Sequence, residues 1–316
     1  MNNYIFFSIL IPAYKAKFLR LAINSVMAQS YRNFELVIVD DNSPEDLKST
    51  VDTFNESKIH YYRNEVGFGA VNVVGNWNKC LEYASGDYVI CMGDDDELSE
   101  RCLEEYVKLI EKYPGLDCYH TRMAYIDETS SIIDLQIDRA KTESVYSAIW
   151  HTWKGRGHVI GDWLFSMSFL KENNGFANFP CAWSSDTITM FMAASSHGIA
   201  NTSYIGFRYR VSNYTISSNN KKDYTFLKLQ SWLDVDKWYK NFLTRKPDND
   251  SDFFYWKYIC DNLDKEMQFS KRMEVRKCFV NDKMSFGAIF LGCNKFGIKK
   301  TVVIKEFLYS LLLLLR

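Results

Sequence analysis

Strand-like and helix-like segments alternate along the first 127 residues of the chain. Apolar residues dominate segments such as 5–14 and 33–43, and an unbroken apolar run is typical of a strand that is covered on both faces. Between such segments apolar residues recur at every third or fourth position, as in 17–29 and 97–114, which is the spacing of a helix that buries one side. This alternation predicts an α/β fold with a doubly wound, mostly parallel sheet.

The remaining chain has a different pattern. From residue 128 the segments become short and irregular, with a short helix expected near 163–173 and another at 184–198, and from residue 222 helical periodicity dominates. We therefore predict one α/β domain that is followed by a helical C-terminal region. The predicted divisions are 1–127, 128–220 and 221–316, of which the first two form a single domain, 1–220.

Acidic residues follow two of the predicted strands. Asp40 and Asp41 end the second strand, and a triplet follows the strand at 87–93. The carboxyl ends of parallel strands meet at one edge of a sheet, and ligands of such folds bind at that edge. We expect the acids to lie beside the end of the first strand. The residues concerned are Pro12, Ala13, Tyr14, Asp40, Asp41, Asp94, Asp95 and Asp96.

The triplet raises the question of how neighbouring negative charges are tolerated. Adjacent carboxylates repel each other unless a positive charge compensates them. Mg²⁺ and Mn²⁺ prefer oxygen ligands and commonly combine one or two carboxylates with phosphate oxygens. A solvated turn that caps the following helix is the alternative, because acidic residues suit a helix N-terminus. Ser43, followed by Pro44, is predicted to cap a helix over 43–55.

Composition and charge narrow the classes of partner. The chain has 316 residues and a net charge of −1, so no global field favours nucleic acid, and we expect no nucleic-acid partner. Eight cysteines occur without a CxxC pair, which favours reduced thiols and a cytoplasmic protein. The start of the chain lacks the basic segment of a signal peptide and instead resembles a strand.

The C-terminal end combines leucines with basic residues. Leu311 to Leu315 precede Arg316, and Lys299, Lys300 and Lys305 lie upstream. This apolar run is too short to span a bilayer, which takes about 20 residues. It is expected either to lie in a membrane interface, which would place the protein at the inner face of the cell membrane, or to dock on the protein body or on a second subunit of a homodimer.

The segments that carry the acids resemble a known family. "SILIPAYKAKFLRLAINSVMAQSYRNFELVIVDDNSPED" and "RNEVGFGAVNVVGNWNKCLEYASGDYVICMGDDDEL" are similar to the opening of the family-2 nucleotide-sugar glycosyltransferases with the GT-A fold. The likeness is specific over about 5–127 and looser over 128–215. It implies a hexosyltransferase with a nucleotide-binding half at 1–127, an acceptor-binding half at 128–220, a UDP-sugar donor and a saccharide or lipid-linked saccharide acceptor for building a surface polysaccharide or glycan.

The resemblance also implies roles on the donor side. Pro12, Ala13 and Tyr14 would line the nucleotide, and Asp40 or Asp41 would hold the base. In the acidic element Gly93 replaces the family's first Asp. Asp95 is then the expected ligand of Mn²⁺ or Mg²⁺, with Asp96 behind it and Asp94 toward the nucleotide. The metal would stabilise the departing nucleoside diphosphate.

Further residues receive roles from the same likeness, each beside a structural alternative. Asp186 would be the general base that deprotonates the acceptor in an inverting reaction, or it caps its helix. Arg210, with Arg208 as the weaker candidate, would contact phosphate through its planar guanidinium, or it is a solvated arginine. Trp183 and His158 would approach a sugar, or they belong to the core.

Other function classes fit less well. A nucleotidyltransferase normally has a glycine-rich phosphate loop after its first strand, where this chain reads "IPAYKAKFL". An NAD-binding domain would show GxGxxG at that place. A catalytically inactive sugar- or nucleotide-binding scaffold of the same fold stays open as an alternative.

Overall fold

The structure is a computed structural model that describes residues 5–212 and 222–313. Among these residues the chain divides into two compact units, one of 5–178 with 185–212 and one of 179–184 with 222–313. The boundary predicted at 220/221 falls outside the described residues.

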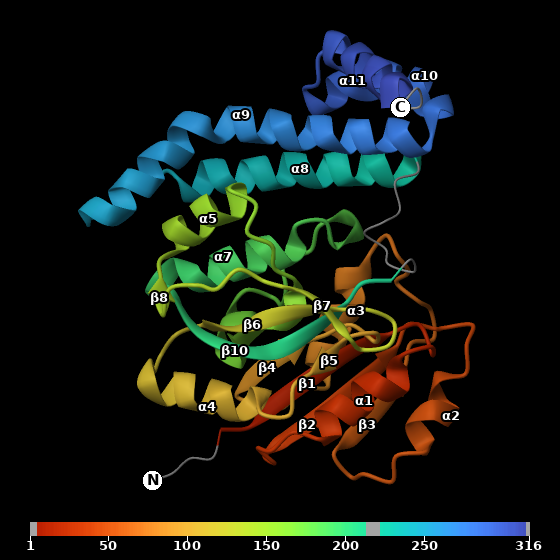
Figure 1. Ribbon diagram of the computed structural model, residues 1–316, viewed down its shortest axis with the longest axis vertical. Coiled ribbons are helices and arrows are strands. Elements are labelled where there is room, and N and C mark those ends of the chain that lie inside the picture. Colours follow the sequence, from red (N-terminus) through yellow and green to blue (C-terminus); the bar gives the residue numbers. More distant parts are fainter. Residues whose placement is uncertain (1–4, 213–221, 314–316) are drawn as a thin grey trace. The chain divides into compact units, whose positions relative to one another are not determined.

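The first unit contains one large sheet flanked by helices (Figure 1). Its strands are β1 (Phe7–Ala13), β2 (Phe34–Asp40), β3 (Ile59–Arg63), β4 (Tyr88–Cys91), β5 (Glu97–Leu98), β6 (Cys118–Ile126), β7 (Ile132–Leu135), β8 (Thr142–Glu143), β9 (Trp163–Ser166) and β10 (Ile199–Arg210). Its helices are α1 (Leu19–Met27), α2 (Leu47–Asp52), α3 (Val73–Glu82), α4 (Cys102–Lys112), α5 (Val145–Trp153), α6 (Met167–Glu172), α7 (Ser185–His197) and the short 3-10 helix η1 (Ile160–Asp162).

The strand order is β3-β2-β1-β4-β9-β6-β10-β5. The long pairings, β1 with β2 and β4, β2 with β3, and β6 with β10, are parallel, whereas the antiparallel pairings are short. The prediction of an α/β fold with a mostly parallel sheet is confirmed. Because β1 lies between β2 and β4, the carboxyl ends of these strands lie side by side, as predicted.

Burial explains why these segments form strands. In β2 every residue is buried, and in β1 every residue except Pro12 is buried. Alternate β1 residues, such as Ile9 and Ile11, share a core with the buried sides of α1 and α4. Since Leu10 between them is also fully buried, both faces of the sheet are covered, which requires an unbroken apolar run.

Two predicted helix starts are wrong. The helix expected from residue 43 begins at Leu47 and is capped by Asp46, whereas the Ser43 hydroxyl donates to the Tyr14 carbonyl and accepts from the Glu45 N–H before the helix starts. The helix expected from residue 97 begins at Cys102, because Glu97 and Leu98 form β5 against β10. In both places a residue that the local pattern assigns to a helix instead contacts a segment that is distant in sequence.

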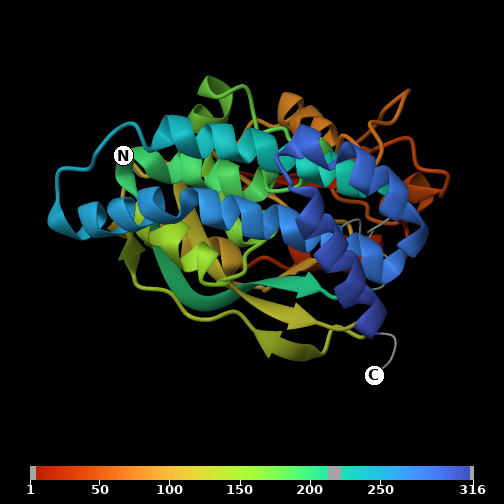
Figure 2. The same ribbon diagram turned by 90° about the horizontal axis from the view of Figure 1, so that it is seen from above.

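The second unit is helical, as predicted. It contains η2 (Pro180–Ala182), α8 (Lys222–Phe242), α9 (Asp250–Asn281), η4 (Lys283–Ser285), α10 (Phe286–Gly292), η5 (Cys293–Phe296) and α11 (Lys300–Leu312). The long helices α8 and α9 run side by side (Figures 1 and 2), and α11 packs on α9. Within 5–212 and 222–313, no helix has both the length and the apolar character that crossing a bilayer requires.

Candidate functional site

The acidic triplet forms a turn at the end of β4. The Asp96 N–H donates to the Gly93 carbonyl at 3.4 Å, so the backbone reverses instead of staying extended. Asp94 Oδ2 accepts hydrogen bonds from the N–H groups of Tyr14, at 2.6 Å, and Lys15, at 2.7 Å. This carboxylate therefore ties the turn to the end of β1. Burial, and next the charge of Asp95, raise the pKa of Asp94 to about 6.

Asp96 ties the same turn to β10. Its Oδ1 accepts from the Arg210 N–H at 2.9 Å, and its Oδ2 accepts from the Gly93 N–H at 3.3 Å. Burial and the neighbouring charge of Asp95 raise the pKa of Asp96 well above its usual value. Asp94 and Asp96 are both buried, and both accept hydrogen bonds from backbone N–H groups.

Asp95 lies between them and is the most accessible of the three acids. Its side chain is 15% exposed, and the Lys15 Nζ lies 3.5 Å from Oδ2. No group of three His, Cys, Asp or Glu side chains within the described ranges is arranged to hold a metal ion. The oxygen donors of the turn still suit a divalent cation, and the Asp95 carboxylate already pairs with a positive group, Lys15. Such an ion would take Asp95 as a protein ligand and complete its shell with diphosphate and water.

Arg210 is fully buried at the end of β10. Its Nε donates to the Asp95 carbonyl at 2.7 Å, and its Nη1 donates to the Asp127 carbonyl at 2.6 Å. Its Nη2 pairs with Glu97 and also donates to Ser130. Every guanidinium nitrogen thus has a partner within the protein, and the hydrogen bond to the Asp95 carbonyl holds the backbone of the acidic turn. The predicted phosphate contact stays a prediction.

The acids at the end of β2 are held equally firmly. Asp40 is fully buried and accepts from the Ser43 N–H, the Tyr61 hydroxyl and Arg63. Asp41 accepts from Asn64 and from the N–H groups of Phe68 and Gly69, with distances of 2.8 to 3.0 Å. These bonds shape the chain that follows β2 and β3.

The end of β1 lies between the two groups of acids. The Ala13 carbonyl accepts from the Asp41 N–H at 2.9 Å, and the Tyr14 carbonyl accepts from Ser43 at 2.6 Å. Ala13 is buried, whereas Tyr14 is 48% exposed and is free to present its ring to a ligand. The structure therefore brings Pro12, Ala13, Tyr14, Asp40, Asp41, Asp94, Asp95 and Asp96 together at one edge of the sheet.

Asp186 belongs to a second cluster, at the start of α7. Its Oδ1 accepts from the Thr187 N–H at 2.7 Å and lies 3.3 Å from the Thr187 hydroxyl. Burial raises the pKa of Asp186 to about 6. The Thr187 hydroxyl also lies 3.3 Å from Nε2 of His158, whose Nδ1 accepts from Trp163 at 3.3 Å. His158 is therefore near Asp186 through one intervening side chain.

Comparison with known proteins identifies the family. The family model described as glycosyl transferase family 2 matches residues 8–177, which is more than half of the chain. This protein belongs to glycosyl transferase family 2. The matched range includes the whole edge formed by β1, β2 and β4.

Curated relatives are similar over a shorter stretch. An Escherichia coli protein named UDP-Glc:alpha-D-GlcNAc-diphosphoundecaprenol beta-1,3-glucosyltransferase WfgD is 34% identical over 113 residues, which are 35% of this chain and 43% of that protein. A Campylobacter jejuni protein named GalNAc(5)-diNAcBac-PP-undecaprenol beta-1,3-glucosyltransferase is 35% identical over 94 residues, 29% of this chain and 30% of that protein. The matched stretches thus span less than half the length of these relatives.

Solved structures extend the likeness to the fold of almost the whole chain. S. aureus TarS 1-349 in complex with UDP-GlcNAc has a TM-score of 0.61 at 14% identity and covers 96% of this chain and 89% of that chain. The Pyrobaculum calidifontis mannosyltransferase PcManGT, in complex with GDP-Man and Mn²⁺, has a TM-score of 0.54 at 13% identity and covers 98% and 88%. This family-2 protein accordingly has the GT-A fold.

Trp183 lies in the second unit of this family-2 protein. Its ring lies under the ammonium groups of Lys228, at 4.2 Å, and Lys277, at 5.5 Å. These cation–π contacts fix the face of the ring, whereas its buried Nε1 has no hydrogen-bond partner among the described residues. Its predicted contact with a sugar stays a prediction.

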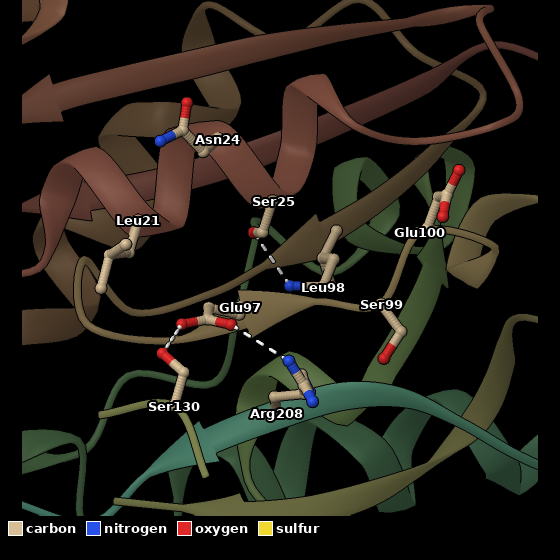
Figure 3. A pocket seen from close by; sticks show the side chains of 9 residues that line it. All are labelled: Leu21, Asn24, Ser25, Glu97, Leu98, Ser99, Glu100, Ser130 and Arg208. Carbon is tan, nitrogen blue, oxygen red and sulfur yellow. Dashed lines mark hydrogen bonds and ion pairs between the residues drawn. The ribbon is translucent and has the colours of Figure 1, made fainter. Parts of the chain in front are cut away.

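A separate cavity of about 490 Å³ (Figure 3) is lined in part by residues 97–100, which directly follow the acidic turn in sequence. Its lining residues are Leu21, Asn24, Ser25, Glu97, Leu98, Ser99, Glu100, Ser130 and Arg208. Figure 3 shows Glu97 between Ser130 and Arg208. Of the residues predicted from the sequence, the weaker phosphate candidate, Arg208, lines this cavity, whereas the residues at the strand ends do not, so we assign the site to the strand ends and not to the cavity.

Sequence reasoning missed the partners of the predicted residues. Thr187 follows Asp186 directly, and a hydroxyl in the first turn of a helix was an available signal. Lys15 follows the Pro12–Tyr14 segment and was an available cation near the acids. Trp163 and Glu97 gave no local signal, because their roles depend on contacts distant in sequence.

Proposed function

We propose that this protein is a metal-dependent, inverting glycosyltransferase. It moves a sugar from a nucleotide-sugar, with UDP as the nucleotide, to a hydroxyl of a saccharide or lipid-linked saccharide during synthesis of a surface polysaccharide or glycan. The observation that carries the proposal is the edge at β1, β2 and β4, where an accessible carboxylate, Asp95, lies between acids that the backbone holds in place. The names of the curated relatives support the substrate classes.

On the donor side, the strand ends shape a nucleotide site. Pro12, Ala13 and the exposed ring of Tyr14 line it. Asp40 and Asp41 fix the chain beside this site by hydrogen bonds, and one of the two carboxylates binds the base. Asp95, with Asp96 and Asp94 beside it, would hold Mn²⁺ or Mg²⁺ together with the donor's diphosphate. The bound ion supplies positive charge that stabilises the leaving diphosphate.

On the acceptor side, Asp186 is the general base. Its carboxylate accepts the proton of the acceptor hydroxyl while that oxygen forms a bond to the anomeric carbon. The bond from this carbon to the diphosphate oxygen breaks on the opposite side, so the configuration inverts. Burial suits this role, because it raises the pKa of Asp186 toward the range in which a base works best.

Isothermal titration with UDP and GDP, each with Mn²⁺ and with EDTA, tests the donor side. We expect Mn²⁺-dependent binding of UDP that is lost in Asp95→Ala and kept in Asp52→Ala, which removes a surface acid paired with Lys48. Folded wild-type protein that binds neither nucleotide would instead favour the inactive scaffold. If UDP binds, a UDP-sugar screen follows, and proton NMR of the product's anomeric centre decides between inversion and retention.

The C-terminal helix α11 supports contact with a membrane that carries the acceptor. Its inner side buries Val303, Glu306 and Ser310, and Glu306 pairs with Arg272 and Arg276 of α9. This packing leaves leucines exposed, including Leu308 at 54% and Leu312 at 60%. The exposed apolar residues of α11 are Ile304, Leu308, Tyr309, Leu311 and Leu312, with Lys300 and Lys305 beside them.

An apolar face flanked by lysines fits an anionic lipid surface, so we propose a peripheral position at the cytoplasmic face of the membrane. Sedimentation with phosphatidylglycerol vesicles should decrease at least fivefold in the triple variant Ile304→Ser, Leu308→Ser, Leu312→Ser. It should not change in Phe254→Ser, which alters an exposed apolar residue of α9. Equal sedimentation of both variants, or loss of a homodimer in the triple variant, would assign the face to another partner.

A further inference from the structure

Four side chains form a hydrogen-bonded series that ends on Asp186. Trp163 is the first residue of β9, His158 precedes η1, and Thr187 lies in the first turn of α7. Trp163 Nε1 lies 3.3 Å from His158 Nδ1, His158 Nε2 lies 3.3 Å from Thr187 Oγ1, and Thr187 Oγ1 lies 3.3 Å from Asp186 Oδ1.

The chemistry of these groups gives the series one direction. An indole N–H is only a donor, so Nδ1 of His158 must be an acceptor and, in the neutral ring, Nε2 carries the proton. His158 Nε2 then donates to the Thr187 hydroxyl, and that hydroxyl has its own proton free for Asp186. An ionised carboxylate accepts only, so no other direction satisfies all three contacts.

The surroundings keep His158 neutral. Burial, and next the positive charges of Arg139 and Arg156, lower the pKa of His158 to about 3. Arg139 lies over the Trp163 ring at 4.8 Å, and both arginines pair with Glu143. Asp162 also lies near Asp186: burial mainly raises the pKa of Asp162, and the Asp186 charge adds to this effect.

We propose that His158 and Thr187 are positioning residues, which hold Asp186 by Oδ1 and leave Oδ2 for the acceptor hydroxyl. Oδ1 receives both the N–H and the hydroxyl of Thr187, and no hydrogen bond to Oδ2 occurs among the residues that the structure describes. The inference rests on the proposed function of Asp186 as the base. It assigns His158 to the carboxylate and not to the donor sugar.

Nitrogen NMR tests the direction of the series without any substrate. In ¹⁵N-histidine-labelled wild-type protein at pH 7, the ring of His158, identified by the signal lost in His158→Gln, should be neutral with its proton on Nε2. In Trp163→Phe, which removes the donor to Nδ1, this preference should weaken. A ring protonated on Nδ1, or a charged ring, would overturn the inference whatever the enzyme's activity.

Kinetics of two Thr187 variants test the consequence. Thr187→Val removes the hydroxyl at nearly constant volume, so kcat should fall about tenfold with KM changed less than twofold, and the acid limb of the kcat profile should move to higher pH. Thr187→Ser keeps the hydroxyl and should stay within twofold of wild type. Equal losses in both variants, or none in Thr187→Val, would overturn the inference. Full activity in Asp186→Asn would overturn the proposed base itself, and the NMR result would stand separately.

Discussion

The acids at the sheet edge and Asp186 at the start of α7, all in the first unit, differ in the groups from which they accept hydrogen bonds. At the edge formed by β1, β2 and β4, the buried acids accept from groups distant in sequence. Asp94 accepts from Tyr14 and Lys15, and Asp96 accepts from Arg210. At the start of α7, Asp186 accepts only from its neighbour Thr187 among the described residues. The edge acids therefore hold the fold together, whereas Asp186 can be changed without releasing another element.

The largest expected effect is on the rate, in Asp186→Asn. A general base contributes about 10²- to 10⁴-fold, and the amide cannot accept the acceptor's proton, so kcat should fall by that amount. Because the contacts of Asp186 are local, the melting temperature and the UDP affinity should stay near those of wild type. Sugar transfer, thermal unfolding and UDP titration measure the three quantities. Glu172→Gln, at an exposed acid of α6, is the matched control. Activity within threefold of wild type would contradict the assignment.

The next effect concerns stability, in Arg210→Leu. This change leaves Glu97 without its buried partner and the Asp95 and Asp127 carbonyls without their donor. Breaking a buried pair typically costs about 3 to 5 kcal/mol of unfolding free energy. Arg208→Leu removes a partly exposed partner of the same glutamate, 3.4 Å away, and should cost less than about 1 kcal/mol.

Urea unfolding of both variants measures this difference. If Arg210 instead contacts phosphate as the family likeness implies, the variant should keep its stability and lose affinity for UDP. The two roles therefore give opposite results in unfolding and in titration.

A smaller effect separates two neighbouring acids. Asp94→Ala leaves the N–H groups of Tyr14 and Lys15 without their acceptor and should lower the unfolding free energy by about 2 kcal/mol. Asp95→Ala removes the charge that raises the pKa of both neighbours, so it should not lower stability at pH 7.5. It should nevertheless abolish metal-dependent UDP binding. Equal losses of stability in the two variants would contradict a structural role for Asp94 that is distinct from the metal-binding role of Asp95.

The sequence predicted the edge well because its signals are local. Unbroken apolar runs identify β1 and β2 as strands with two covered faces, and their alternation with helices fixes parallel neighbours. The positions of Asp40, Asp41 and the acidic triplet then follow from topology alone. The predicted common edge is confirmed because the Tyr14 N–H donates to Asp94 and the Tyr14 carbonyl accepts from the Ser43 hydroxyl, so the ends of β2 and β4 both contact the end of β1.

The details that failed depend on contacts between distant segments. Ser43 carries a good capping side chain and accepts from the Glu45 N–H, but its hydroxyl also donates to the Tyr14 carbonyl, 29 residues away, and the helix starts later, at Leu47. His158 meets Thr187 across 29 residues, and no local pattern indicates that contact. Arginine is a residue type that often binds phosphate, but the sequence does not show that Arg210 is buried and donates to backbone carbonyls.

The smallest effect is the pH dependence, which reports on Asp186 without a mutation. The base must be ionised to accept a proton, and burial raises its pKa from 3.8 to about 6. At saturating substrates kcat should be level above pH 7 and should fall about tenfold for each unit below pH 6, in single-turnover measurements that isolate the chemical step. Asp94 has a pKa near the same value, but it belongs to the edge, so its protonation should change UDP affinity and not kcat. A kcat that stays level down to pH 5, together with UDP affinity that falls, would assign the acid limb to the edge and contradict a buried base at α7.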